Sequence, residues 1–443
     1  MPKTIQVYEH GCVQVGHGSL TMQEFDRLVV YNECHGGRFF SVGHRRIHFA
    51  QYVGVIQVGC TTIEILPKAG KASDADLAKW RGVLVDMLRR AGLLPLESLT
   101  DASLRLRHAS LFDLYVEAFL RETRRLVHQG LVRKYRRTEG NLPVLKGQLM
   151  FREQLKRNLI HRERCYSRHQ CYDRDNVFNA VLKTAIDIVV RTTPSPFLMQ
   201  EAGALGLSFE GIGNQRITAD TFRRILYDRN TACYRKALTL AELIILHHAP
   251  DVAHGRRDVL AILFDMNQLF ESYVLRELKR AEPHFRDSAL RVSGQRSKTF
   301  WRAPDMSKTI RADIVVDYAD DGRRHRVVLD TKWKLPRDGR PGDADLRQMY
   351  AYSLQFGANA TYLVYPRANA TVSTVGRFMP AAGDITAQEP RCGLWFVDLF
   401  DGNQLNPRFG QRLCESVLDQ GPACVSGAVC HPEEGIGPTL HES

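Results

Sequence analysis

The sequence predicts an α/β protein of the multi-domain, α+β kind, and three observations lead to this fold class. Residues 1–70 are rich in β-branched and aromatic residues cut by glycine, as β-strands are. Residues 71–250 carry apolar residues at helical spacing. Between residues 251 and 405 helical and strand patterns alternate, as in an α/β domain. A chain of 443 residues is too long for one core, so we expect these segments to form separate domains.

The strands and helices of the first half follow from local signals. The strands are expected in "TIQVYEHGCVQVG", "RFFSVGHRRIHFA" and "YVGVIQVGCTTIEILPKAG". The helical spacing begins in "SDADLAKWRGVLVDMLRRAG", with Ser73 or Asp74 as N-cap and Gly92 after the last turn. A second amphipathic helix, "ASLFDLYVEAFLRETRRLVHQG", is closed by Gly130. Two more helices are expected in "DNVFNAVLKTAIDIVVRTT" and "NTACYRKALTLAELIILHH".

The second half is expected to start after a linker, "HHAPDVAHGRRD". The run "DVLAILFDMNQLFESYVLREL" then predicts a helix, followed by strands, a helix, and the short strand "ATYLVYP". Residues 406–443 lose periodicity and are rich in glycine and proline, which predicts a poorly ordered tail.

The composition excludes some classes of protein and favours an anionic partner. No window approaches eighteen uninterrupted apolar residues, which argues against a membrane span. The start "MPKTIQVYEHGC" has no apolar signal core, and ten scattered cysteines are most simply reduced thiols, so we expect a cytoplasmic protein. The net charge of +12 favours nucleic acid, and a solvated basic surface is the alternative.

The stretch "RADIVVDYADDGRRHRVVLDTKWK" predicts a β-hairpin, because Asp321-Gly322 is the strongest short signal for a two-residue type I′ turn. That turn fixes the pairing, so Asp313 falls opposite Asp330. Lys332 lies two residues further on and therefore on the same face as Asp330. The hairpin thus gathers two carboxylates and an ammonium group at one end.

Facing carboxylates destabilise a sheet unless a cation compensates them. Oxygen ligands select a hard ion, and Mg²⁺ binds one or two carboxylates while keeping several waters, with Mn²⁺ as the alternative ion. A lysine beside the ion can orient or deprotonate a water and stabilise charge on phosphorus, as phosphodiester hydrolysis requires. The alternative is an exposed hairpin with a charged end, and a one-residue slip would separate the aspartates.

Further residues could complete this site. Glu271 lies at the edge of the apolar stripe of its helix, either as a third ligand or as a solvated glutamate. Gln348 and Tyr352 share one face of a helix in "QMYAYSL", either at the site or at the core boundary. Asp305, in Pro304-Asp305, does not reach this register and is expected in a loop.

Together these residues resemble the PD-(D/E)xK nuclease fold. The matching positions are Glu271, Asp313, Asp330, Lys332, and the Q-x-x-x-Y pair Gln348 and Tyr352 of RecB-like members. The segments "YVGVIQVGCTTIEILPK", "VLKGQL", "DRDNVFNAVLK" and "FDMNQLFESYV" are similar to the McrC family, the nuclease subunits of McrBC-type restriction systems. The resemblance extends to about residue 405, and one departure is Ala312-Asp313 where the family has Pro-Asp.

The resemblance implies a DNA endonuclease that acts on double-stranded DNA with a hexameric AAA+ GTPase of the McrB kind. Residues 1–70 would dock on this partner, residues 71–250 would contact the partner and DNA, and residues 251–405 would be the nuclease domain. The chain has no G-x-x-x-x-G-K-[ST] loop, so it is not the GTPase by that route. A stand-alone RecB-like repair nuclease and a non-catalytic adaptor that activates the GTPase remain as alternatives.

Two clusters raise the question of zinc. Neither has a C-x-x-C knuckle, so we do not expect a zinc site in them. The first cluster is His161, Cys165, His169 and Cys171, and its residues could equally well belong to a basic helix. The second cluster is Cys414, Cys424, Cys430 and His431.

Overall fold

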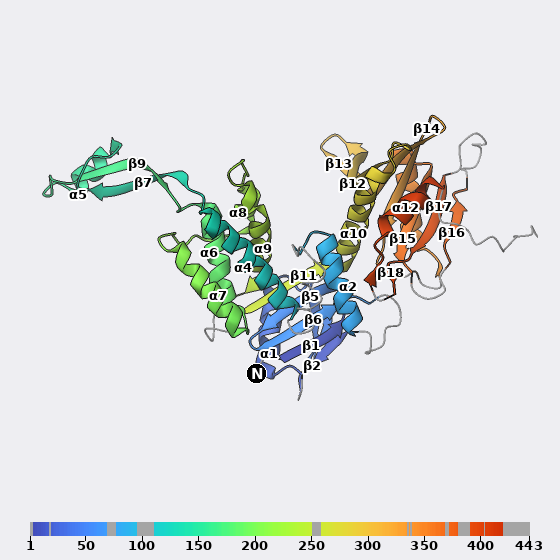
Figure 1. The fold of residues 1–443 in the computed structure, drawn as a ribbon, viewed down its shortest axis with the longest axis horizontal. Coiled ribbons are helices and arrows are strands. Elements are labelled where there is room, and N and C mark those ends of the chain that lie inside the picture. The colour runs from blue at the N-terminus through green and yellow to red at the C-terminus, as the bar shows by residue number, and fades with distance from the viewer. Residues whose placement is uncertain are drawn as a thin grey trace, which may run out of the picture. The chain divides into compact units, whose positions relative to one another are not determined.

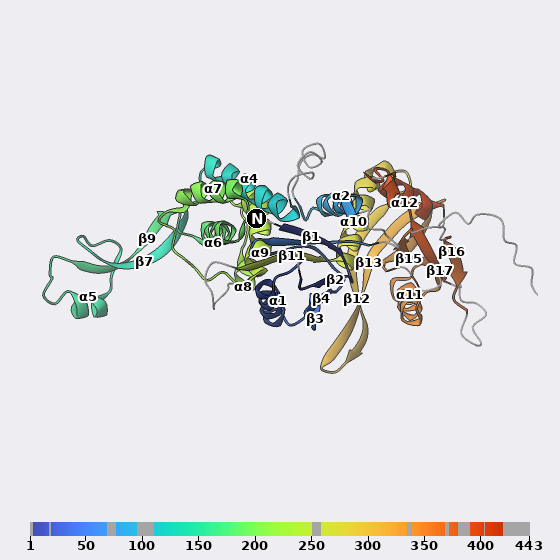
Figure 2. The same cartoon turned by 90° about the horizontal axis from the view of Figure 1, so that it is seen from below.

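The computed structural model describes residues 3–16, 19–68, 77–94, 110–249, 258–334, 336, 339–367, 372–379, 390–402 and 404–419. They form two compact units, Met1–Tyr273 with Gly402–Leu405, and Val274–Asp401 with Asn406–Ser443 (Figures 1 and 2). Both units mix helices and sheets, as the α+β prediction requires. In the described part of the chain, no helix combines the length and apolar character needed to cross a bilayer.

The first unit is built on a five-stranded sheet of order β1-β6-β5-β11-β10. Its strands are β1 (Lys3–Tyr8), β5 (Tyr52–Val58), β6 (Thr61–Leu66), β10 (His248–Ala249) and β11 (Val259–Asp265). Beside it lies a three-stranded sheet of β2 (Cys12–Gln14), β3 (Phe40–Gly43) and β4 (Arg46–Phe49). The strands β1 to β6 therefore all lie between Lys3 and Leu66, the part of the chain where the sequence predicted strands.

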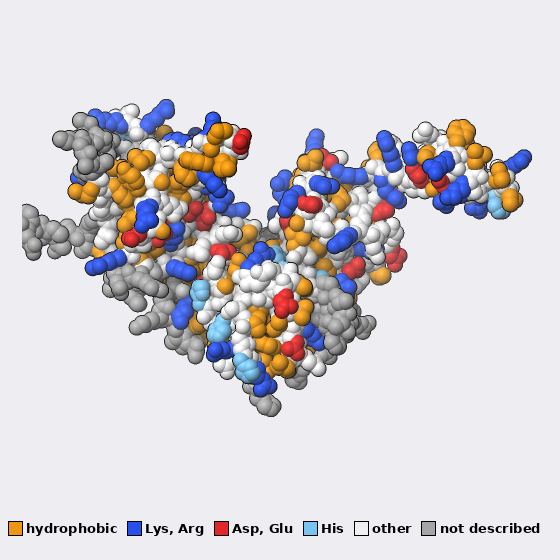
Figure 3. Space-filling model, turned by 180° about the vertical axis from the view of Figure 1, so that it is seen from behind, with side chains coloured by type: hydrophobic (Ala, Val, Ile, Leu, Met, Phe, Trp, Pro, Cys, Tyr) orange, Lys and Arg blue, Asp and Glu red, His pale blue; other side chains and the backbone are white. Residues whose placement is uncertain are grey.

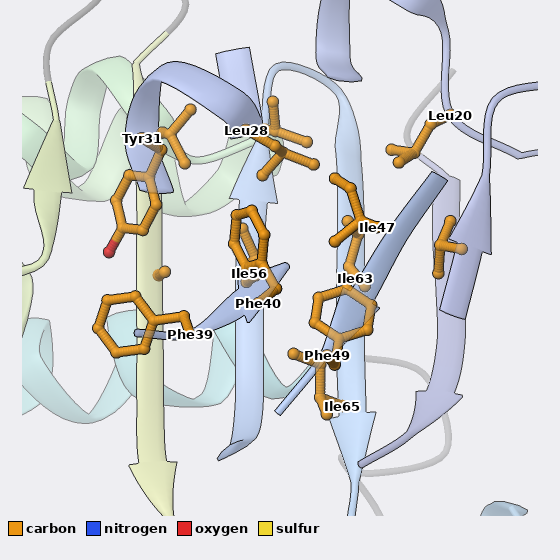
Figure 4. Packing of buried hydrophobic residues seen from close by; sticks show 14 of the residues in the cluster. Leu20, Leu28, Tyr31, Phe39, Phe40, Ile47, Phe49, Ile56, Ile63 and Ile65 are labelled. Carbon is orange, nitrogen blue, oxygen red and sulfur yellow. The ribbon is translucent and has the colours of Figure 1, made fainter. Parts of the chain in front are cut away.

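The helix α1 (Met22–Cys34) packs against one face of this sheet and closes the core on that side. The helix begins at Thr21, whose side chain forms a capping box with Glu24. Figure 4 shows Leu28 and Tyr31 of the helix above Ile56 and Ile63 of the sheet, with Phe39, Phe40, Ile47 and Phe49 between the layers. Burying these side chains stabilises the unit by roughly 1.5–3 kcal/mol each.

The middle of the chain is helical, as the sequence predicted. Its helices are α2 (Leu77–Arg90), α4 (Leu111–Gln129), α6 (Val177–Thr192), α7 (Pro196–Gly206), α8 (Ala219–Arg224) and α9 (Arg235–Leu246), with 3-10 turns at Leu207–Phe209 and Ala232–Tyr234. Gly92 follows α2 and Gly130 ends α4, both with positive φ (68° and 89°), which confirms the two expected ends. Ser73 and Asp74 lie outside the described residues.

An antiparallel sheet interrupts this helical middle and projects from it as an arm (Figure 1). It consists of β7 (Lys134–Leu142), β8 (Gln148–Leu149) and β9 (Cys165–Asp173), with the short helix α5 (Phe151–Arg157). Lys and Arg side chains gather on this arm (Figure 3). The sequence predicted a mainly helical segment here. The basic helix considered for residues 161–171 is wrong, because β9 occupies most of that stretch.

The boundary between the units lies later than residue 250. The run Val259–Asp265 was expected to open a helix of the second domain, but it forms β11 and pairs with β5 and β10 of the first sheet. Gly54 of β5 has a φ of 135°, and a Cβ there would lie 2.1 Å from the Ile262 carbonyl oxygen. A glycine is therefore needed for β5 and β11 to pair this closely. The helix that follows, α10 (Met266–Ala281), contains the boundary between Tyr273 and Val274.

The second unit is a six-stranded mixed sheet of order β12-β13-β14-β15-β17-β16. Its strands are β12 (Arg291–Ala303), β13 (Met306–Asp320), β14 (Arg323–Thr331), β15 (Ala360–Pro366), β16 (Thr374–Arg377) and β17 (Arg391–Val397). The strands β14, β15 and β17 run parallel, and α11 (Asp343–Phe356) connects the first two of them. Met349, Tyr352 and Phe356 of α11 share a buried cluster with Val315 and Val328 of the sheet.

The chain continues beyond these elements with more order than expected. A 3-10 turn at Glu282–His284 follows α10 and precedes β12. Beyond β17, the short strands β18 (Phe400–Asp401) and β19 (Gln404–Leu405) lead to the helix α12 (Phe409–Leu418). It buries Phe409, Leu413, Cys414 and Val417, and Gly410 lies against the Glu277 backbone. The prediction of a poorly ordered tail from residue 406 is therefore wrong for this helix, and residues 420–443 lie outside the described residues.

Candidate active site

The hairpin of β13 and β14 has the turn and the register that the sequence predicted. Asp321 and Gly322 have φ of 45° and 74°, as both central residues of a type I′ turn require. Asp320 pairs with Arg323, and the ladder continues to Ile314 and Leu329. The next residues on the two strands are Asp313 and Asp330, so the turn brings the two aspartates to the far end of the hairpin.

The two aspartates differ in their surroundings. Asp313 accepts a hydrogen bond from the Thr331 backbone NH at 3.1 Å and one from the Thr331 hydroxyl at 3.4 Å. Asp330 is 1% exposed, which makes it one of the most buried charged residues of the unit. A carboxylate this deeply buried is costly unless it is paired or binds a cation.

Helix α11 supplies the partners on one side of Asp330. The Gln348 amide nitrogen donates to Asp330 Oδ1 at 3.2 Å and lies 2.7 Å from the Tyr352 hydroxyl. Tyr352 in turn donates its hydroxyl proton to the Arg311 carbonyl oxygen of β13. The expected pair on α11 therefore links the helix to both strands of the hairpin and fixes the orientation of Asp330.

Lys332 lies between Asp330 and an acidic residue that the sequence analysis did not select. Its Nζ is 2.9 Å from Asp330 Oδ2 and 3.4 Å from Asp345 Oδ1. Asp345 precedes Gln348 by one helical turn, so the same face of α11 that carries Gln348 and Tyr352 also carries Asp345. That spacing was the signal that could have identified it.

Burial and charge shift the pKa values of Asp313, Asp330 and Lys332. Desolvation, with the neighbouring charge of Asp313, raises the pKa of Asp330 to about 7, although Lys332 opposes the shift. Desolvation also raises the pKa of Asp313. For Lys332, burial lowers the pKa, but the carboxylates of Asp330 and Asp345 outweigh it and raise the pKa overall. Lys332 is therefore a cation at neutral pH, whereas the raised pKa of Asp330 means that its carboxyl group binds a proton more readily than a free aspartate does.

The donor set fits a hard divalent cation. Oδ2 of Asp330 is buried and accepts no hydrogen bond of good geometry, although the Lys332 ammonium group lies close to it. An acceptor left in this way, beside a second carboxylate, is suited to an ion that binds through oxygen. Among the described residues, no three His, Cys, Asp or Glu side chains converge on one point. Two carboxylates with water are the set that Mg²⁺ uses most readily.

Comparison with known proteins shows the family of the chain. The sequence profile described as "McrBC 5-methylcytosine restriction system component" matches residues 47–366. The chain belongs to this McrBC family. The matched segment includes the hairpin and helix α11, and hence all the site residues described above. Among curated proteins, no sequence matches the chain.

Two solved structures are similar to this McrBC family member. One is the refined half-complex from the tetradecameric assembly of Thermococcus gammatolerans McrB AAA+ hexamers with bound McrC, at 20% identity and a TM-score of 0.64 over 94% of this chain and 100% of that chain. The other is the cryo-EM structure of the Thermococcus gammatolerans McrBC complex, at 21% identity and a TM-score of 0.47 over 63% of this chain and 88% of that chain. The first likeness extends over nearly the whole fold.

The other residues that the sequence suggested for a site are Glu271, Asp305 and the two His and Cys clusters. Glu271 lies on α10 within the first unit, so its part in the site stays a prediction from the sequence. Asp305 lies in the turn between β12 and β13, as expected. His161, Cys165, His169 and Cys171 form no metal-binding group in the part of the chain that is described, and Cys424, Cys430 and His431 lie outside it.

Proposed function

We propose that this McrBC family member is the DNA endonuclease subunit of a modification-dependent (type IV) restriction complex. The observation that carries the proposal is the pair of Asp313 and the buried Asp330, with the Lys332 ammonium group beside Asp330. Two facing carboxylates, one of them buried, do not stabilise a fold, because desolvation and mutual repulsion both oppose it. A catalytic centre does gain, because the pair would hold a cation that supplies Lewis-acid chemistry.

Asp313 and Asp330 would hold Mg²⁺, with Mn²⁺ as the alternative ion and Glu271 as a further proposed ligand. When bound, the metal supplies Lewis-acid activation of the phosphodiester and of a water. The chain's own residues set the geometry around it. Gln348 and Tyr352 orient Asp330 through their hydrogen bonds, and Lys332 stabilises negative charge at the reacting phosphate. The carboxylates of Asp330 and Asp345 raise the pKa of Lys332, so Lys332 is a cation in the metal-free chain.

The proposed partner is a hexameric AAA+ GTPase of the McrB kind, whose GTP hydrolysis the chain would stimulate. The similar solved structure contains such hexamers with bound McrC. The first unit is the proposed partner-binding part, because it has its own sheet and core and contains neither Asp313, Asp330 nor Lys332. Its basic arm offers a surface for an anionic or acidic partner. Restriction of incoming DNA would take place in the cytoplasm.

A second hypothesis is an enzyme that acts alone, a repair nuclease. A third hypothesis is a non-enzymatic adaptor that activates the GTPase and holds DNA. The repair nuclease would cleave DNA without the GTPase. The adaptor would not require two adjacent carboxylates, one of them buried, beside an ammonium group.

Plasmid cleavage with Mg²⁺, GTP and the partner tests the proposal. The wild-type chain is expected to cut only when all three are present, and Asp330→Asn is expected not to cut. Asp320→Asn is the matched control, because it makes the same substitution at the exposed end of the same hairpin. Equal cleavage by Asp330→Asn and Asp320→Asn would refute the proposed site, and cleavage without partner and GTP would favour the repair nuclease.

A further inference from the structure

Strands β12 and β13 continue past the rest of the sheet as a two-stranded ribbon (Figure 2). The ladder between β13 and β14 stops at Ile314, whereas β12 and β13 stay paired from Arg296 and Ala312 to Ala303 and Met306. The ribbon of residues 296–312 therefore begins next to Asp313, at the end of the hairpin that carries the two aspartates. At a rise of about 3.3 Å per residue, its seven residue pairs extend about 23 Å, or roughly seven base-pair steps of DNA.

The base of the ribbon is held against the unit. The Lys298 ammonium group donates to the Gln355 carbonyl oxygen at 2.7 Å and lies 5.4 Å from the centre of the Phe356 ring. Ile310, which pairs with Lys298, packs against the buried cluster under α11. The ribbon is thus anchored at the end where it leaves the site.

The outer half of the ribbon exposes large apolar side chains. Phe300, Trp301 and Met306 are 50%, 46% and 61% exposed. Phe300 is the extra residue of a β-bulge, because Thr299 pairs with Thr309 and Trp301 already pairs with Lys308. Bulges change the direction of side chains and are frequent beside active sites. Two adjacent exposed aromatic residues at such a position contribute little to the fold.

The charge of the ribbon indicates what these side chains contact. Its residues include five basic side chains and one acidic side chain, a net charge of +4. The basic residues are Arg296, Lys298, Arg302, Lys308 and Arg311, and the acidic one is Asp305. Two copies of such a surface repel each other, whereas duplex DNA presents a phosphate every few ångströms. A two-stranded β-ribbon is also narrow enough to enter the major groove.

We propose that the ribbon of residues 296–312 lies in a groove of the duplex beside the scissile phosphate, with Arg302 and Lys308 on the phosphates and Phe300 and Trp301 against the bases. This inference rests on the proposed DNA substrate and assigns the element that holds it. The ribbon positions the duplex relative to Asp313 and Asp330. It contributes affinity and register along the DNA, and none of its side chains takes part in bond cleavage.

Binding of the full chain to a short duplex in EDTA tests the charges without cleavage. Replacing Arg302 and Lys308 by glutamine is expected to lower the slope of log affinity against log salt by up to about 1.8, and to weaken binding about tenfold to a hundredfold near 0.1 M salt. The matched control replaces Arg323 and Arg324 by glutamine. This change removes the same charge from two exposed residues at the start of β14, next to the hairpin turn. Equal effects of the two double variants would overturn the proposal.

Trp301 provides a direct signal from the ribbon. The other three tryptophans, Trp80, Trp333 and Trp395, are at most 5% exposed, so acrylamide quenching reports mainly Trp301. DNA is expected to protect this fluorescence, and Trp301→Ala is expected to weaken binding about fivefold or more. Phe197→Ala, which removes another exposed aromatic side chain, should leave binding unchanged.

Other results of the binding and quenching measurements would also overturn the proposal that the ribbon binds DNA. No binding of DNA by the wild-type chain, or quenching that DNA does not alter, would overturn the proposal. So would a dimer that Trp301→Ala dissociates without loss of DNA affinity, because the ribbon would then be an interface between copies. Failure of the nuclease proposal is recognised separately, since it depends on cleavage by Asp330→Asn and not on binding in EDTA.

Discussion

Replacing Asp330 by asparagine removes one of two facing carboxyl groups at nearly constant volume, and we expect it to stabilise the metal-free second unit at neutral pH. Burial, together with the charge of Asp313, raises the pKa of Asp330 from 3.8 to about 7. Each pKa unit corresponds to ~1.36 kcal/mol, so ionisation of this carboxyl group opposes folding by roughly 4 kcal/mol above pH 7. This figure already includes the ion pair with Lys332, which opposes the rise in the pKa of Asp330.

The sign of the pH dependence follows from the two protonation states. Between pH 3.8 and about 7 the unfolded chain has released a proton that the folded chain still holds. The free energy of unfolding therefore falls as pH rises through this window and levels off above it. From pH 5 to pH 7 the wild-type chain should lose about 2–3 kcal/mol relative to Asp330→Asn, in which this position does not titrate.

Urea unfolding in EDTA at several pH values measures this difference. Tryptophan fluorescence is a suitable signal, because Trp301, Trp333 and Trp395 lie in the second unit. Asp320→Asn controls for the loss of an exposed carboxylate. Mg²⁺ added at pH 8 should stabilise the wild-type chain and not Asp330→Asn, because a ligand stabilises only the state that binds it. Parallel pH profiles for the wild-type chain and Asp330→Asn would refute the reasoning.

Three further outcomes are expected. Asp313→Ala, Asp330→Ala and Lys332→Ala should each abolish DNA cleavage and leave partner-stimulated GTP hydrolysis near normal, as plasmid cleavage and phosphate release measured side by side would show; cleavage that survives in Asp330→Ala would place the site elsewhere. The isolated chain should bind duplex DNA weakly, with little sequence preference and steep salt dependence, and salt-independent binding in an anisotropy titration would contradict this. A fragment of residues 1–273 should capture the GTPase partner in a pull-down, whereas 1–250 should fail because it lacks β11; capture by residues 274–419 alone would reverse the assignment.

The parts of the fold that could be predicted are those fixed by local interactions. The Asp321-Gly322 turn needs two residues that accept positive φ, and this requirement alone sets the register that brings Asp313 to Asp330. Likewise, the spacing of Gln348 and Tyr352 places them on one face of a helix wherever that helix lies. The same spacing places Asp345 on that face, although its contact with Lys332 is known only from the structure.

The parts that could not be predicted depend on distant partners. The run Val259–Asp265 is short and apolar, and periodicity cannot distinguish a buried strand from a helix there. It becomes a strand because β5, far away in sequence, offers it an open edge. In the arm, apolar and polar residues alternate too little to predict its strands from the sequence. Instead, ion pairs between β7 and β9, such as Arg136 with Asp173 and Arg168 with Glu139, connect its two long strands.

The position of β11 in the first sheet has a consequence for synthesis of the protein on the ribosome. Strand β5 ends at Val58, and its neighbour β11 begins at Val259, about 200 residues later. At about 5–20 residues per second, the nascent chain waits roughly 10–40 s before β11 can be made. Throughout this delay one edge of β5 has free amide and carbonyl groups, and such an edge pairs readily with other chains. Nascent chains that stall before residue 259 should therefore be held by chaperones or aggregate.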